Sequence, residues 1–562
     1  MDLRKYNIYF HTHTISGIII AALLYVIFFA GSFSFFRDDI TAWQKGRSAV
    51  SEKIDADYNF LMDSLSQNYN LRGRDFGFFL LRQGHGAYVN MSSSKDTTIS
   101  KPRKEAPARG RGRRGGDGDS AYFLYHFTDK KPVTYAEGYD MGEFLYRLHF
   151  LAQLNQVPIR IGTPFGYLLA GIVSFLFLFA LITGLLLHWD KIVSNFFIFR
   201  PWSKWKTVWT DMHTALGVIG FPFQFIFAVT GIVLIVNFVL ISPFARLLYN
   251  GDQEKVYEEL EYTVPMKAEY SYRPMAGSFD LNRFVNDWEN QWDRNPVTRI
   301  NIINYLDSNM QVLISSKPHP AENFAGSGYA LVDVASGKVL HQKSPATDTH
   351  YIDRVKSVLY HLHFGDFGGK PLRIVFFILG LTGCIVIISG IVIWLVARDK
   401  TSTPRHKRVF NFWASNFFLA ACLSMLPVTA FTFIMIKALD VVNQSVIYQV
   451  YFYSWLVLGI FLMAWRNLPL MNKLTLGLSA ALCLGVPLAN GLYDGLWMWD
   501  TYLRREWDIF FIDFLFLTLS AVSGFALWRV MRDAKPFKII GSRESPGLAR
   551  ETLFLNYIRT IF

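Results

Sequence analysis

Histidines at matching positions in two apolar stretches are the residues of this sequence best suited to chemistry. His13 lies at the start of one stretch, HTHTISGIII, and His213 at the start of another, MHTALGVIG, 200 positions later. Glycines follow both histidines one turn and five turns further along a helix: Gly17 and Gly31 in the first stretch, Gly217 and Gly231 in the second. An imidazole at a membrane edge is costly unless it faces the protein interior or a ligand. The pattern therefore predicts an internal duplication of a two-helix membrane unit whose histidines bind a metal or a haem.

A second pair of histidines ends two related motifs. His149 belongs to FLYRLHF and His363 to VLYHLHF, and each motif precedes a Gly-x-Pro and another apolar span. His361 projects to nearly the opposite side of a helix from His363, so the two cannot share one site. His188 ends the second span, and the equivalent position in the fourth span is Trp394. This asymmetry fits a metal ligand, His188, that only one half of the duplication supplies. A single histidine at a helix end is more often an interfacial residue, but the repetition favours metal binding.

Composition defines the class of protein. The 562 residues are 51% hydrophobic and 18% charged, and the mean hydropathy is +0.22. These values predict an integral membrane protein, mainly α-helical, with soluble α+β insertions. We expect about eight spans of roughly 20 residues, the length that a bilayer core requires. The expected spans lie near residues 14–36, 164–188, 213–240, 372–396, 411–436, 447–465, 474–493 and 509–530.

Lysine and arginine residues indicate the orientation. They gather at the N-terminus, in the loops after the second, fourth and sixth spans, and in the tail. The positive-inside rule makes that side cytoplasmic, so the long loops 37–160 and 241–370 face outward. Much of the formal net charge of +12 is explained in this way, and it indicates a membrane protein rather than a nucleic-acid-binding one. The first span is long and carries His13, so we expect it to be retained rather than cleaved as a signal peptide.

The sequence lacks the motifs that are typical of several cofactor-binding domains. The three cysteines, Cys384, Cys422 and Cys483, lie in apolar spans, and none forms a CxxC pair. Because CxxCH is absent, any haem is bound non-covalently. No GxGxxG follows a strand, and no P-loop or HExxH occurs, so we expect no nucleotide or flavin domain.

The outward loops differ in composition. Residues 101–120, KPRKEAPARGRGRRGGDGDS, are basic and of low complexity, and we expect a disordered insert there. AYFLYHF, after the insert, alternates like a strand. In the second loop a helical pattern begins at Ser278, and the strand patterns TRINIINYL, QVLISS and YALVDVASGKVL follow it. This order predicts a small α+β domain. His85 and His126 are expected surface histidines that could touch a substrate.

We therefore divide the chain into a first transmembrane helix, a first outward domain, two further transmembrane helices, a second outward domain, a fourth transmembrane helix, a C-terminal four-helix membrane unit and a cytoplasmic tail. Their expected bounds are 1–36, 37–160, 161–240, 241–370, 371–400, 411–532 and 533–562.

Two segments carry a resemblance to a known family. VDVASGKVL, residues 332–340, resembles the closing strand and turn of a PepSY domain. The stretch from Leu181 to Phe223, LITGLLLHWDKIVSNFFIFRPW followed by TDMHTALGVIGFPF, resembles the PepSY-associated transmembrane family. It combines a histidine that ends one span, a Phe-Arg-Pro loop and an Asp-x-His that opens the next span. The resemblance covers about residues 1–400, and the last four spans contain no histidine.

Members of this family include iron-regulated inner-membrane proteins and ferrisiderophore reductases that carry two b-type haems. The resemblance implies a bacterial inner-membrane protein with periplasmic outward loops and about two haem b groups. We expect His13, His188 and His213 at a haem near the cytoplasmic face, and His149 and His363 at a haem near the outer face. Electrons would come from quinol or a cytoplasmic reductase and reach a ferric siderophore or another ferric chelate. The chain need supply no catalytic acid or base for this reaction.

Two alternatives belong to other classes. The eight spans could form a transporter or permease accessory for iron or a chelate, for which Asp513 inside FIDFLFL is the most suggestive residue. The PepSY-like domain could instead regulate a partner from a membrane anchor, but that leaves the repeated histidines unexplained. The haem hypothesis has a distance problem, because ligands at opposite ends of a span of roughly 23 residues could lie ~35 Å apart along the axis.

Overall fold

The computed structural model describes residues 2–48, 56–81, 86–98, 120–159, 164–198, 200, 203, 205–320, 323–398 and 402–532. The chain forms two compact units. The membrane unit comprises Met1–Ser48, Asp140–Ile235 and Ile374–Phe562, and the sheet unit comprises Ala49–Tyr139 and Val236–Arg373. Nearly all of the expected insert 101–120, and the whole of the expected tail 533–562, lie outside the described residues.

Eight helical segments among the described residues are long and apolar enough to cross a membrane, as the sequence predicts. Arg405–Leu423 and Met425–Ala438 form one of these segments together. The helices are α1 (Leu3–Ser34), α5 (Phe165–His188), α7 (Trp205–Leu248), α11 (Gly369–Arg398), α12 (Arg405–Leu423), α13 (Met425–Ala438), α14 (Gln444–Trp465), α15 (Leu468–Asp494) and α17 (Trp507–Arg532).

Within α7 the backbone departs from helical geometry at Val236, where φ is −115° and ψ is 16°. This departure falls where the chain passes from one unit to the other. Shorter helices complete the membrane unit: α2 (Arg37–Lys45), α4 (Met141–His149), α6 (Ile192–Phe196), α16 (Met498–Leu503) and the 3₁₀ turns Ala152–Gln156 and Trp189–Lys191.

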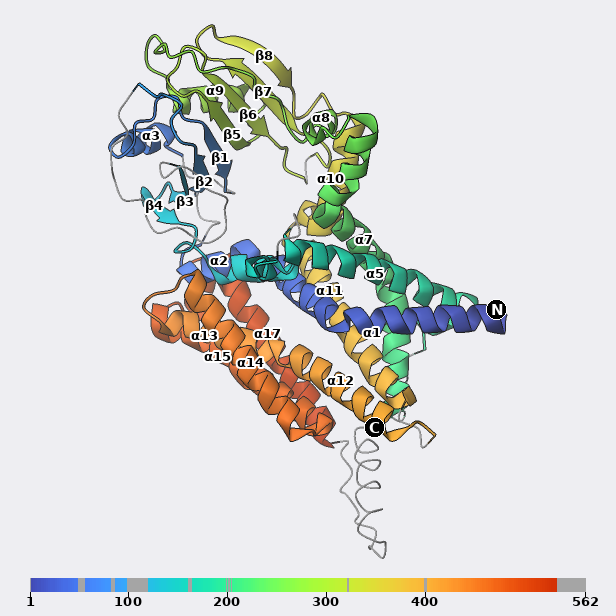
Figure 1. Ribbon diagram of the computed structural model, residues 1–562. Coiled ribbons are helices and arrows are strands. Elements are labelled where there is room, and N and C mark those ends of the chain that lie inside the picture. The colour runs from blue at the N-terminus through green and yellow to red at the C-terminus, as the bar shows by residue number, and fades with distance from the viewer. Residues whose placement is uncertain are drawn as a thin grey trace, which may run out of the picture. The chain divides into compact units, whose positions relative to one another are not determined.

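The helices α12 to α17 pack side by side (Figure 1), and some of their buried polar side chains bond to one another and to α2. Asp513 on α17 is fully buried and accepts hydrogen bonds from Trp43 Nε1 at 2.7 Å and from Asn490 Nδ2 at 2.9 Å. Lys437 donates to the Trp43 carbonyl at 2.7 Å and pairs with Asp494. Asp513 therefore helps to join the C-terminal helices to α2, and a transport pathway is not needed to explain it.

The sheet unit differs from the two separate outward domains that we expected. Both loops contribute to one eight-stranded sheet with the order β4-β3-β2-β1-β5-β6-β7-β8, and every neighbouring pair is antiparallel. The strands are β1 (Phe76–Leu80), β2 (Gly86–Met91), β3 (Ala121–His126), β4 (Lys131–Thr134), β5 (Val297–Ile303), β6 (Gln311–Ser316), β7 (Gly328–Asp333) and β8 (Lys338–Lys343). The pairing of β1 with β5 joins the loops, with Phe76 opposite Ile302. The strands of each loop carry apolar side chains on one face, and these form a continuous core only when the two sets of strands pair in one sheet.

One face of the sheet is covered by α3 (Tyr58–Ser66) and α9 (Leu281–Gln291) (Figure 1). Asp57 and Asp280 cap these two helices, each accepting a bond from a backbone N–H of the first turn. The helix after Ser278 and the strands expected in both loops are thus confirmed. The unit also contains α8 (Gln253–Glu259), α10 (Tyr351–Phe364) and the 3₁₀ turn Asp366–Gly368.

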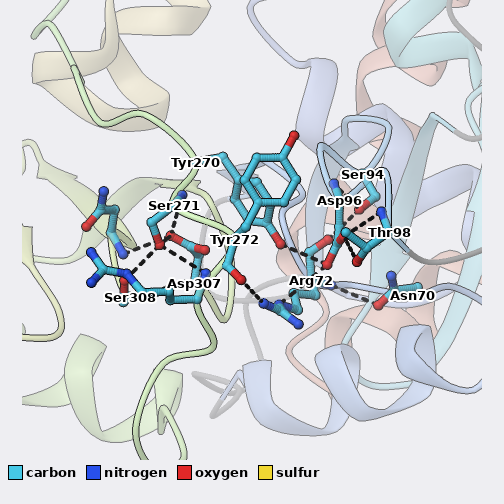
Figure 2. Close-up of polar contacts among 12 residues, drawn as sticks. Asn70, Arg72, Ser94, Asp96, Thr98, Tyr270, Ser271, Tyr272, Asp307 and Ser308 are labelled. Carbon is cyan, nitrogen blue, oxygen red and sulfur yellow. Dashed lines mark hydrogen bonds and ion pairs between the residues drawn. The ribbon is translucent and has the colours of Figure 1, made fainter.

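Polar contacts beside the sheet also bind the two loops together (Figure 2). Arg72 Nη2 donates to the Tyr272 carbonyl at 2.9 Å, and the Tyr270 hydroxyl donates to Asp96 Oδ2 at 3.0 Å. Gly73 permits this approach, because its φ is +70° and a Cβ there would lie 2.9 Å from the Tyr270 ring. Thr98 also donates to Asp96, at 2.5 Å, so this carboxylate is the centre of the cluster.

Replacing Asp96 should loosen the sheet unit. Asp96→Ala leaves the Tyr270 hydroxyl and Arg72 without their shared carboxylate, and we expect a loss of about 1–3 kcal/mol from the hydrogen bonds removed. Thermal unfolding followed by tryptophan fluorescence measures this loss. Tyr270→Phe removes one of these bonds and should cost less. Equal stability of Asp96→Ala and the unaltered protein would show that the cluster does not hold the loops together.

Candidate metal centre

His13 is held against the neighbouring helix α5 by a specific contact. Its Nδ1–H donates to the carbonyl of Ala180 at 2.9 Å. One turn later on α5 is Gly184, where an added Cβ would lie 3.1 Å from His13 Cε1. Helical side chains lean toward the N-terminus, so a side chain at position 184 would cover the carbonyl at position 180. The glycine therefore leaves that carbonyl accessible to the imidazole.

His213 makes the same contact in the other half of the chain. Its Nδ1–H donates to the carbonyl of Val386 at 2.9 Å, and an added Cβ on Gly390 would lie 3.1 Å from His213 Cε1. The hydroxyl of Ser389 lies 3.3 Å from the same Nδ1. As on α5, the carbonyl belongs to the residue four positions before the glycine. One arrangement thus recurs for two histidines that are 200 positions apart.

His149 repeats the arrangement on α1. Its Nδ1–H donates to the carbonyl of Ile27 at 2.8 Å, and its ring fills the place of a side chain on Gly31. Gly31 is again four residues after the carbonyl. We call this contact the histidine–glycine clamp: a histidine Nδ1–H bonded to the carbonyl that precedes a glycine by four residues.

The clamp determines which ring nitrogen can bind a metal. A carbonyl can only accept, so the hydrogen resides on Nδ1 and the neutral ring keeps the lone pair of Nε2. Histidines that bind metals in proteins have this second bond from the other nitrogen, which fixes their tautomer and direction. His13, His149 and His213 therefore each have an Nε2 suited to a metal.

His13 and His213 lie close enough to share one metal. Their ring centroids are 6.1 Å apart, and the rings are inclined by 67°. Two imidazole nitrogens on opposite sides of one metal lie about 4 Å apart, since each bond is about 2 Å long, and the ring centres are somewhat farther apart. Gly17 and Gly217 follow the two histidines by one turn, and an added Cβ on either would meet no atom within 4 Å. The residues present thus fit a flat group bound between the two histidines.

His188 has a different environment. Its Nδ1 accepts a hydrogen bond from Asn195 Nδ2 at 3.0 Å, so the neutral ring carries its hydrogen on Nε2. His188 lacks the clamp, and His13 and His213 are the better-suited pair of the three histidines expected at this site.

Ion pairs hold the helix that carries His149. Glu143 on α4 accepts from Arg147 Nε at 2.6 Å and pairs with Arg37 of α2 at 2.5 Å. Burial lowers the pKa of His149, which favours the neutral ring. Ile27, its partner, follows His13 by fourteen residues on α1, or about 21 Å along the axis. The separation is shorter than the ~35 Å expected from a full span, because α4 contacts α1 before its end.

His363 lies in the last turn of α10, in the sheet unit. Its neighbour His361 donates from Nδ1 to Asp366 at 2.7 Å, in agreement with the expectation that the two histidines have separate roles. The other end of α10 is anchored by Lys343, which pairs with Asp353 and, at 2.5 Å, with Glu261. Glu261, His350 and Asp353 have ligand atoms within 4.8 Å of one another, but the Lys343 ammonium occupies the position of a cation between the carboxylates.

Two features of the site were not expected from the sequence. Arg200, in the Phe-Arg-Pro loop, makes a two-pronged pair with Asp211, with Nε at 2.8 Å and Nη2 at 2.9 Å. Asp211 is two residues before His213, so the ion pair with Arg200 helps to fix the start of α7. Arg200 belongs to the motif FRP and Asp211 to the motif DMH, so the sequence could have indicated this ion pair. The clamp itself could have been found from the intervals, because Gly184 and Gly390 occupy aligned positions in the two halves.

The fold defines a multi-pass membrane protein with a second compact unit built on a sheet. The chain belongs to the PepSY-associated TM region family, whose model matches residues 10–397. A similar protein is the uncharacterised protein PA4219 of Pseudomonas aeruginosa, which is 24% identical over 298 residues, 50% of this chain and 72% of its own length. The family match includes all five candidate histidines and ends before α12.

The anchor of α10 should respond to acid. Burial acts to raise the pKa of Asp353 and Glu261, but the bonds from Lys343 hold both values below the usual range. A carboxylate whose pKa is lowered by folding stabilises the protein at pH values above its unfolded pKa, which is about 3.9 for Asp and 4.3 for Glu. This stabilisation is lost as the pH falls through the lower pKa of the folded state. Hydrogen–deuterium exchange of residues 351–364, corrected for intrinsic rates, should therefore be constant from pH 7 to 5 and rise below about pH 4.

The variant Asp353→Asn should show faster exchange in α10 already at pH 7, by roughly tenfold or more, because removing one partner of a buried pair is strongly destabilising. Asp348→Asn, near an exposed turn, serves as the control. Unchanged protection of α10 in Asp353→Asn would contradict the role given to the anchor.

Proposed function

We propose that this protein is a di-haem electron-transfer protein of the bacterial inner membrane that reduces ferric chelates, ferric siderophores among them. The histidine–glycine clamp is the observation that carries the proposal. His13 and His213 would hold one haem b through Nε2, and His149 and His363 would hold a second. The two sequence motifs FLYRLHF and VLYHLHF support the second pair.

A bound haem supplies one-electron chemistry, and its potential is set by axial ligands and burial. The chain supplies orientation: three carbonyls hold three imidazoles in one tautomer, and glycines leave room beside them. The two levels lie about 21 Å apart along α1, from His13 to Ile27, whose carbonyl His149 contacts. Haems held at both levels would leave a shorter distance for an electron to cross.

The reaction is a one-electron reduction of chelated Fe(III) to Fe(II). Fe(II) is a softer ion and is held less strongly by hard oxygen donors, so reduction releases it from an oxygen-donor chelate. No proton transfer by the protein is required. The electron donor in this proposal is quinol or a cytoplasmic reductase, and the basic loops orient the termini to the cytoplasm and the sheet unit to the periplasm.

Haem content tests the ligand assignment. We expect about two non-covalent haems per chain, and His213→Ala should retain about one, since Ala is well tolerated in a helix. The pyridine haemochrome assay, normalised to protein, measures this ratio. His11→Ala is a matched control, because His11 is exposed on the same helix as His13. Full haem content in His213→Ala, or a chain isolated without haem from haem-replete cells, would refute the assignment.

The acceptor is tested by reoxidation. Protein reduced with dithionite and then freed of it should be reoxidised by a ferric hydroxamate or a related chelate, with Fe(II) collected by ferrozine. Deletion of residues 101–120 should leave this rate unchanged, since a segment of so polar a composition has little apolar surface with which to bind. Reoxidation by oxygen and quinone alone would identify an electron-transfer protein with another acceptor.

A further inference from the structure

The face of the sheet opposite α3 and α9 carries a row of aromatic side chains. Antiparallel pairing places Phe79 opposite both Tyr88 and Arg299, so the three side chains project from one face of β5, β1 and β2. Tyr122 on β3 lies on the same face, and its ring is nearly parallel to that of Tyr88, at 6° with centroids 6.1 Å apart. The ring of Tyr135, just after β4, lies 6.2 Å from both tyrosines. We call these five residues the aromatic face.

The aromatic face is partly open to solvent, since Tyr88 and Tyr135 are half-buried and the other three residues are exposed. Phe79 exposes 42% of its surface and Tyr122 exposes 43%, although the opposite side of the same strands forms the core. Neighbouring strands lie about 4.8 Å apart, so the four strands from β5 to β3 form a platform roughly 14 Å wide. A contiguous exposed patch of this kind marks a binding surface more often than scattered apolar residues do.

Arg299 gives the platform a positive charge. Its guanidinium lies 4.5 Å from the centroid of the Phe79 ring, and its Nε donates to Asn301 Oδ1 at 3.1 Å. Arg299 is exposed, and no carboxylate among the described residues is paired with it. Strands β1 to β5 contain no aspartate or glutamate, while Lys131 and His126 lie on the same face. The surface is therefore complementary to a flat anion.

We propose that the aromatic face binds the ferric chelate, and that it selects a chelate whose iron is held by flat, anionic aromatic arms, as in a tris-catecholate complex. This inference rests on the proposed function, which supplies the ferric chelate as the class of substrate. Aromatic arms stack on tyrosine rings, and a planar guanidinium attracts and stacks on the same arms. The amides of Asn90 and Asn301, on the same face, can donate to the oxygens around the metal. A hydroxamate complex has no rings to stack and should bind more weakly.

Gallium(III) complexes test this surface without electron transfer, because Ga(III) is not reduced under these conditions. Gallium tris-catecholate is titrated onto the oxidised, detergent-solubilised full chain, and binding is measured by calorimetry. Tyr122→Ala and Arg299→Gln should each weaken binding about tenfold or more, the equivalent of about 1.4 kcal/mol. Tyr272→Ala is the control, since Tyr272 is a 51% exposed tyrosine of the same unit outside the aromatic face.

Unaltered affinity in both variants would overturn the proposal, as would absence of gallium tris-catecholate binding or tighter binding of the gallium hydroxamate. The two variants lie on different strands, so Arg299→Gln keeps the test decisive if Tyr122→Ala does not fold. A negative result in this binding test can be distinguished from a failure of the proposed function. A chain that reduces ferric chelates but whose aromatic-face variants bind normally keeps the function and loses this site.

Discussion

The bond from a histidine Nδ1–H to a helix carbonyl is the interaction on which the membrane part of this protein depends. A helix carbonyl already accepts one N–H from its own helix and has a second lone pair to offer, but a side chain four residues later normally covers it. Glycine at that position removes the cover at Gly31, Gly184 and Gly390. The hydrogen bond that positions each imidazole also leaves its Nε2 available, so the contact that packs the helices would also orient the ring for the proposed metal.

This constraint explains why glycines are placed where they are in α1, α5 and α11. α1 has both roles: it presents His13 to α5 and receives His149 at Ile27. Its two levels are thereby set about 21 Å apart along one rigid element. The sheet unit follows a different rule, in which two loops separated by about a hundred residues complete one sheet and one core. The half contributed by each loop would expose an apolar face alone.

Hydropathy and spacing were sufficient to predict the eight spans, the strands of both loops and the helix after Ser278, because each pattern is local to one element. The union of the loops was not predicted, since the pairing of Phe76 with Ile302 joins residues that have no periodic relation in the chain. The repeated intervals indicated His13 and His213, but not that their rings would lie 6.1 Å apart. The state of His188 depends on Asn195, a contact across a bend that periodicity does not describe.

The central claim is that the clamped histidines His13 and His213 would hold one haem iron between them. Electron paramagnetic resonance of the oxidised, purified protein tests it most directly, because iron between two imidazoles is low-spin and iron with an open position is high-spin. The account predicts low-spin ferric signals from two haems, one of which disappears or becomes high-spin in the double variant His13→Ala, His213→Ala. A protein without haem signals, or one whose low-spin signals are unchanged in that variant, would contradict it.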